Sequence, residues 1–172
     1  YETKTGKRVD FSFGGSIALA NQIASLGAPA DGIFFVGDEA TEVLRRAGLI
    51  HDEGYYTMLT NSLVLIGRDG AQPVSSLDDL EFDSVRIAIG DPAVAPAGRY
   101  ARQALKSIDL WDTLSDRLIL SLDVRAAMAA VESGNADYGI VYRTDALTSK
   151  SVFIQFEITD VNTQIKYQTI PL

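Results

Sequence analysis

The sequence contains no cysteine and one histidine, His51. Without cysteine the chain has no disulfide, no thiolate nucleophile and no Cys-ligated metal. His51 lies in the polar segment HDEGYY, which is typical of a solvated loop, and a lone histidine does not make a His-based metal site. We therefore expect neither a metal ion nor another cofactor.

The motifs of common enzymes are also missing. A Ser–His–Asp triad would need His51 as its base, and neither G-x-S-x-G nor G-x-x-x-x-G-K-[ST] occurs. Asp and Glu are plentiful, but they are scattered over predicted helix caps and exposed helix faces, where they are usually solvated. These carboxylates are the only remaining candidates for catalysis, and we expect that the protein is not an enzyme.

No apolar run approaches the roughly 20 residues that a membrane helix needs. The first residues, YETK, are neither a start methionine nor a charged-then-apolar leader, so we expect a processed or trimmed product. Apolar residues make up 47% of the sequence and charged residues 22%, which is typical of a folded globular protein.

Positive charge is in short supply. The chain has 15 Lys and Arg against 23 Asp and Glu, a formal net charge of −8 at pH 7. This balance argues against a nucleic-acid partner, because phosphates attract basic surfaces. It would also repel a small anion at long range, so an anion site here has to rely on short-range hydrogen bonds.

What the sequence does contain is a series of apolar strands that lead through small residues into helices. The best example is the loop at 90–98, GDPAVAPAG, which follows a buried strand at 85–89 and opens a helix over 97–108. Similar junctions occur at Gly15-Ser16, after a strand predicted at 8–13, and at Asp123-Val124. Strands that alternate with helices predict an α/β fold.

Such junctions suit an anion, because the first N–H groups of a helix are unpaired and carry the positive end of the helix dipole. Three junctions that meet at one edge of a sheet could hold a dianion without any Lys or Arg. Tyr142, at the end of the apolar strand YGIVY, would present a hydroxyl at the same edge. The alternatives are structural: Ser16 as a simple helix cap, Tyr142 as a buried tyrosine with a satisfied hydroxyl, and junctions that bind nothing.

Residues 55–67 form an unusually long extended stretch with the polar pair Asn61-Ser62 in its middle. The chain could pass from one lobe to another at this pair, or the stretch could be one long strand of a single sheet. Further strands are predicted at 31–36, 117–122, 138–142, 152–158 and 164–171.

Several segments resemble the periplasmic molybdate-binding proteins of bacterial ABC importers. The most similar segments are GAPAD at 27–31, GDPAVAPAGRYARQAL at 90–105 and DVRAAMAAVESGNADYGIVYRTDA at 123–146. Looser matches are FGGSIALANQI at 13–23, NSLVLI at 61–66 and WDTLS at 111–115. The resemblance runs over nearly the whole chain.

The resemblance implies a two-lobed α/β fold of the type II periplasmic-binding-protein class, each lobe a mainly parallel sheet flanked by helices. Residues 1–62 and 164–172 would form the first lobe, and residues 63–163 the second. Such a protein closes on a tetrahedral oxyanion, molybdate or tungstate, and delivers it in the periplasm to a membrane permease. Molybdenum would enter only within the oxyanion, not as a free cation.

In that family neutral donors hold the anion: serine hydroxyls, backbone N–H groups at helix starts and one tyrosine hydroxyl. Carried over by motif, these roles fall on Ser16, Ala97, Val124 and Tyr142. The neighbouring amides of Gly15 and Ile17 are weaker candidates.

The resemblance also has gaps. The family's first strand with its Ser-Ser loop and its C-terminal helix have no counterpart here, and GIFFVGDE is one residue longer than usual. The first lobe is therefore expected to be incomplete, less stable and prone to self-association, with weakened or lost binding. Two alternatives stay open: a binder of sulfate, phosphate or an organic anion, with Arg125 or Arg143 as its cation, and the effector-sensing domain of a transcription regulator.

Overall fold

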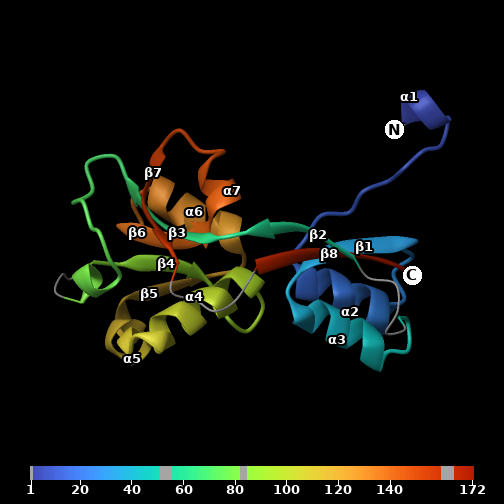
Figure 1. Cartoon of the computed structure of the whole chain (residues 1–172), viewed down its shortest axis with the longest axis horizontal. Coiled ribbons are helices and arrows are strands. Elements are labelled where there is room, and N and C mark those ends of the chain that lie inside the picture. Colours follow the sequence, from blue (N-terminus) through green and yellow to red (C-terminus); the bar gives the residue numbers. More distant parts are fainter. Residues whose placement is uncertain (1, 51–55, 82–84, 160–164) are drawn as a thin grey trace.

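The computed structural model describes residues 2–50, 56–81, 85–159 and 165–172; His51 lies outside these ranges. Figure 1 shows two units side by side, joined by long strands. The helices are α1 (Glu2–Thr5), α2 (Ser16–Leu26), α3 (Asp38–Arg46), α4 (Pro96–Ser107), α5 (Leu110–Leu114), α6 (Val124–Glu132) and α7 (Arg143–Ala146). The strands are β1 (Gly32–Val36), β2 (Tyr56–Asn61), β3 (Leu63–Arg68), β4 (Ile87–Gly90), β5 (Leu118–Ser121), β6 (Tyr138–Tyr142), β7 (Val152–Ile158) and β8 (Ile165–Pro171).

The five-stranded unit contains β3 to β7 and helices α4 to α7, with the strand order β5-β4-β6-β3-β7. Strands β5, β4 and β6 are parallel, whereas β3 runs antiparallel to both β6 and β7. Alternate side chains of β3 point to opposite faces: Leu65 packs in one buried cluster with Leu105 of α4, and Val64 in another with Val131 of α6. Helices therefore cover both faces of this sheet.

The three-stranded unit contains β1, β8 and β2, in that order, together with α2 and α3. Ile33 and Phe35 of β1 face the two helices and pack with Ala20 and Leu44. Strand β8 runs antiparallel to both of its neighbours. The prediction of a mainly parallel sheet in each lobe is therefore wrong for this unit, and the larger sheet is mixed. The reason is that β8 inserts between β1 and β2 from the far end of the chain.

The strand predicted at 8–13 is not formed. Residues 6–15 have no regular secondary structure, and Phe11 and Phe13 are 75% and 89% exposed. The segment extends away from the body of the molecule in Figure 1. Alternating apolar residues need a neighbouring strand to form a ladder, and no described strand lies beside this segment.

The chain passes between the two sheets at Ser62. Strand β2 ends at Asn61 in the three-stranded sheet, and β3 begins at Leu63 in the five-stranded sheet. The crossing predicted at Asn61-Ser62 is thus present, and the alternative of one strand in one sheet is wrong. The Asn61 amide donates to Thr144 Oγ1 at 2.8 Å and to the Tyr167 hydroxyl at 3.1 Å, which ties the crossing to both units.

Candidate oxyanion-binding site

The start of α2 presents Ser16, which is 9% exposed. Gly15 is the N-cap residue and Ser16 the first helical residue, so the prediction that Ser16 caps the helix is wrong by one position. The Ser16 hydroxyl instead accepts a hydrogen bond from the Val36 N–H at 3.1 Å. A serine hydroxyl that accepts one bond still has its own proton to donate. The first N–H groups of the helix, including that of Ile17, have no partner within the helix.

The loop before α4 is held by Asp91. Its carbonyl oxygen accepts from Val94 N and Ala95 N, and its carboxylate accepts from Ala93 N at 2.8 Å. This loop places Pro96, which lacks an N–H, at the first helical position. The Ala97 N–H is therefore the first donor of α4, and Ala97 is 2% exposed.

Gly98 explains why this helix begins so close to the sheet. A Cβ at this position would lie only 1.9 Å from the Gly90 carbonyl oxygen at the end of β4. Only glycine leaves room for the helix start to touch the strand end. The Gly-rich loop thus fixes the Ala97 N–H at the carboxyl end of β4.

The start of α6 is capped by Asp123, as the sequence predicts. The Asp123 carboxylate accepts from Ala126 N at 2.8 Å, and its carbonyl oxygen accepts from Ala127 N at 3.1 Å. The N–H groups of Val124 and Arg125 precede these two and have no partner within the helix. Unlike α2 and α4, this helix therefore has a side-chain cap, and the cap is a carboxylate beside the free donors.

Tyr142 ends β6 and is 4% exposed. Its hydroxyl is buried and has no hydrogen-bond partner among the described residues. Among the described residues, nothing supplies the partner that the alternative of a satisfied hydroxyl requires. Burial raises the pKa of Tyr142 well above its usual range, and the neighbouring Tyr167 and Tyr100 add to the rise. The hydroxyl thus stays protonated and able to donate at physiological pH.

The structure brings the predicted residues together. Val36, Ala97 and Tyr142 belong to one buried cluster, and Val124 packs against it. Ser16 joins this group through its hydrogen bond with Val36 N. Gly15 lies beside the loop that precedes α4, because a Cβ on Gly15 would be 4.0 Å from the Val94 carbonyl oxygen. Candidate donors from both units therefore belong to or border one buried cluster.

The model of the bacterial extracellular solute-binding protein family matches residues 1–171. The chain belongs to this family. Its members are solute-binding proteins rather than enzymes, which confirms the expectation of no catalytic activity. The predicted relationship to the molybdate-binding proteins is supported by similarity to a molybdate-binding protein, ModA, of Haemophilus influenzae: 39% identity over 84% of this chain and 58% of that protein.

A Bacillus subtilis protein, YvgL, is 38% identical over 91% of this chain and 60% of its own length; its name assigns it provisionally to the substrate-binding lipoproteins of ABC transporters. The chain thus spans about 60% of the length of these curated relatives. The structure of a periplasmic molybdate-binding protein of Azotobacter vinelandii matches 99% of this chain and 76% of its own, with a TM-score of 0.79 and 24% identity. The fold is therefore that of the α/β periplasmic binding proteins.

The two candidate cations of the organic-anion alternative, Arg125 and Arg143, each form an ion pair with a carboxylate. Arg125 Nε lies 3.8 Å from Asp145 Oδ1, and Arg143 Nε lies 3.8 Å from Glu157 Oε2. The side chain of Arg125 is 84% exposed. Neither guanidinium therefore supplies a buried positive charge for an anion.

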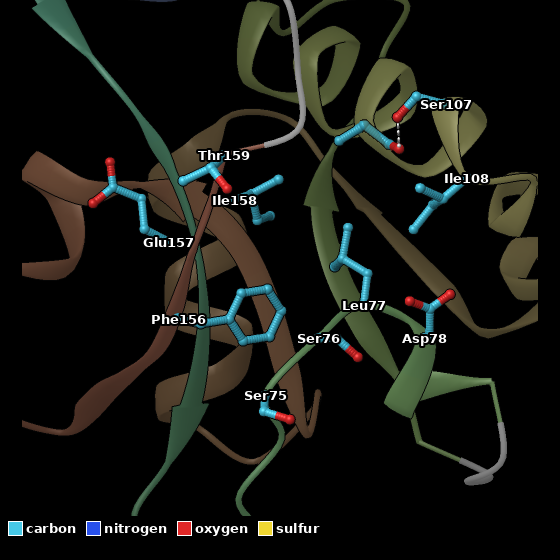
Figure 2. A pocket seen from close by; sticks show the side chains of 11 residues that line it. Ser75, Ser76, Leu77, Asp78, Ser107, Ile108, Phe156, Glu157, Ile158 and Thr159 are labelled. Carbon is cyan, nitrogen blue, oxygen red and sulfur yellow. Dashed lines mark hydrogen bonds between the residues drawn. The ribbon is translucent and has the colours of Figure 1, made fainter.

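A cavity of about 160 Å³ lies at the opposite end of α4 from Ala97. Figure 2 shows Phe156 and Ile158 of β7 on one side and Leu77 and Ser107 on the other. None of the described residues that line it is Lys or Arg, whereas Asp78 and Glu157 carry carboxylates. Its lining does not suit an anion.

Two further tyrosines, Tyr167 and Tyr100, lie near Tyr142. The sequence did not predict that either belongs to the site. The Tyr167 ring packs edge-on against Tyr142 with 6.3 Å between ring centroids, and it stacks on Phe34. Tyr100 lies near Gly37, where a Cβ would be 3.5 Å from its hydroxyl. The alternation in IKYQTIP places Tyr167 on the sheet face away from the helices, but its packing against β6 is a contact between units that no local pattern encodes.

Two arginines of α4, Arg99 and Arg102, have partners among the described residues. Arg99 Nη1 forms an ion pair with Glu39 Oε1 at 2.5 Å. The Arg102 guanidinium lies 5.2 Å from the centroid of the Trp111 ring. The Glu39 pair joins the two units beside the candidate site.

Proposed function

We propose that this protein binds a tetrahedral oxyanion, molybdate or tungstate, between its two units. The observation that carries the proposal is the Tyr142 hydroxyl, which is buried without a partner among the described residues and lies in the same cluster as the start of α4. A buried unpaired hydroxyl costs about 1–3 kcal/mol, so a ligand that accepts its hydrogen bond recovers this energy.

The proposed donors are neutral. They are the hydroxyls of Ser16 and Tyr142 and the backbone N–H groups of Ala97, Val124 and, in a lesser role, Gly15 and Ile17. Each donor to a charged acceptor contributes about 1.5–3 kcal/mol, and each helix start adds the positive end of its dipole. Several such bonds hold a dianion despite the net charge of −8. The similarity to ModA of Haemophilus influenzae supports molybdate as the ligand.

In this proposal the two units are the two lobes of a binding protein, residues 1–62 with 164–172 and residues 63–163. The protein delivers its anion to the membrane permease of an ABC importer, in the periplasm or, as the name of YvgL suggests for that relative, from a lipid anchor at the cell surface. No helix of the described residues has both the length and the apolar character needed to span the bilayer.

Isothermal titration calorimetry with molybdate, tungstate and sulfate tests the proposal. We expect heat with molybdate and tungstate and little with sulfate, because the larger anions match donors that are set farther apart. Heat with sulfate alone would replace molybdate by sulfate as the ligand. Absence of heat with all three would contradict oxyanion binding by this chain and favour the effector-domain alternative.

A further inference from the structure

The two units are joined by an ion pair beside the candidate site. Glu39 lies in the first turn of α3, in the three-stranded unit, and Arg99 lies in the first turn of α4, in the five-stranded unit. Glu39 Oε1 and Arg99 Nη1 are 2.5 Å apart. The other ion pairs among the described residues, Arg8–Asp10, Glu42 with Arg45 and Arg46, Arg86–Asp137, Arg125–Asp145 and Arg143–Glu157, lie within one unit or within the N-terminal segment.

The Arg99 side chain is oriented by a second contact, within its own unit. Its Nε donates to the Pro92 carbonyl oxygen at 3.0 Å, which fixes the side chain against the loop that precedes α4. A cation near a helix start is disfavoured by the helix dipole, and the first turn of α4 contains no acidic residue. The Glu39 carboxylate from the other unit compensates for this, so the pair is most favourable when the units are close together.

The pair sits where the two units touch. A Cβ on Gly37, two residues before Glu39, would lie 3.7 Å from Pro96 Cβ and 3.5 Å from the Tyr100 hydroxyl. Pro96 immediately precedes Ala97, whose N–H is a proposed donor. Separation of the units at Glu39 and Arg99 would therefore also separate Ser16 from Ala97.

We infer that Glu39 and Arg99 form a latch that holds the two units closed and sets how long the bound anion is retained. The inference rests on the proposed function. The side chains are 41% and 35% exposed, and ion pairs of this exposure contribute little on their own. The latch therefore tunes the dissociation rate and leaves the donors of the site unchanged.

Stopped-flow dissociation of molybdate from the full chain tests the latch. We expect Glu39→Gln to raise the dissociation rate about two- to fivefold, and 0.5 M salt to reduce the difference because it screens the pair. Glu42→Gln is the matched control: it removes the same charge from the same helix, but Glu42 pairs with Arg45 and Arg46 inside α3. Equal rates in the two variants would overturn the latch.

A second measurement needs no ligand. The chain has no cysteine, so spin labels at Gln22→Cys in α2 and Gln103→Cys in α4 report the distance between the units. We expect Glu39→Gln, but not Glu42→Gln, to shift the population toward longer distances. Unchanged distances in Glu39→Gln would likewise overturn the latch. A chain that binds no oxyanion but still opens in Glu39→Gln would contradict the proposed function and leave the latch supported.

Discussion

Tyr142 places an unpaired hydroxyl inside a buried cluster at the junction of the two units. Such a group lowers the stability of the free protein, and in the proposed function it gains a partner when the anion binds. This combination gives Tyr142 opposite roles in folding and in binding, and a single substitution separates them.

Tyr142→Phe is expected to weaken molybdate binding about 10- to 150-fold, because it removes one hydrogen bond to a charged acceptor. The free energy of unfolding of the ligand-free protein should stay the same or rise, because an unsatisfied hydroxyl is removed. Calorimetry and urea unfolding measure the two effects. Tyr56→Phe, at a residue that is 68% exposed, is the control. Undiminished affinity would remove Tyr142 from the site.

The raised pKa of Tyr100 predicts that the free energy of unfolding falls at alkaline pH. Burial raises the pKa of Tyr100 to about 12, and the charges of Glu39 and Asp38 add to the rise. An unfolded tyrosine titrates near pH 10, so the folded state favours the neutral form. The resulting stability is fully present below about pH 10 and is lost as the pH rises toward 12.

Urea unfolding at pH values between about 9 and 12 measures this loss. Tyr100→Phe should lessen the fall in unfolding free energy relative to the wild type, while Tyr142 and Tyr167, whose pKa values burial also raises, account for part of what remains. A fall that is identical in the variant would contradict the assignment to Tyr100.

At the scale of single residues, the sequence predicted the positions of candidate donors where those positions follow from local rules. Ala97 and Val124 follow small or capping residues at helix starts, and both lie where the spacing predicted. Ser16 shows the limit of that reasoning, because its hydroxyl bonds to Val36 N of a neighbouring strand. The Glu39–Arg99 pair was not predicted, because it depends on how two separate units meet.

Among the helices of the site, α6 differs in having a charged cap. The Asp123 carboxylate satisfies Ala126 N, but it also brings a negative charge to a helix start that is proposed to bind an anion. Capping and anion binding therefore oppose each other at this element.

Asp123→Asn is expected to keep the cap, since asparagine caps as well as aspartate, and to raise molybdate affinity at low salt. Asp123→Ala should cost about 1 kcal/mol of unfolding free energy because the cap is lost. Calorimetry at two ionic strengths and thermal unfolding check both variants. An Asn variant with lower affinity would show that the carboxylate supports the site.

Helices and buried strands were predictable where neighbouring residues determine them. The sequence of β4, the Gly-rich loop and α4 is continuous, and its apolar spacing already places one helix after one strand. Sheet pairing is not local: β8 lies between β1 and β2, which precede it by most of the chain, and its direction could not be read from its own residues. The strand prediction for residues 8–13 was wrong for the same reason, because the alternation of apolar residues does not show whether a partner strand is present.

At the scale of the whole molecule, the two sheets differ in how they are covered. Among the described residues, helices pack on both faces of the five-stranded sheet but on only one face of the three-stranded sheet. On the latter, Phe34, Tyr56 and Leu59 are 49%, 68% and 59% exposed. Strand β2 is also an edge strand, so apolar side chains accompany unpaired backbone groups there.

We expect this chain to self-associate through that sheet, with a mass that rises with protein concentration in light scattering. Leu59→Lys should keep the protein monomeric, because a charge on an edge strand opposes edge-to-edge pairing. Leu122→Lys is the control, since Leu122 is exposed by 77% in the other unit. A concentration-independent monomer in the wild type would contradict the expectation.

The unequal helical cover of the two sheets also predicts a difference in local unfolding between the two units. Regions with fewer buried contacts unfold locally at lower free energy, so amide hydrogen exchange should divide the chain into a slow unit around β3, β4 and β6 and a faster one around β1, β2 and β8. The proposed donors are drawn from both. In the proposed function the anion binds only when both units are folded, so it would stabilise the weaker, three-stranded unit by mass action and act as a folding cofactor for it.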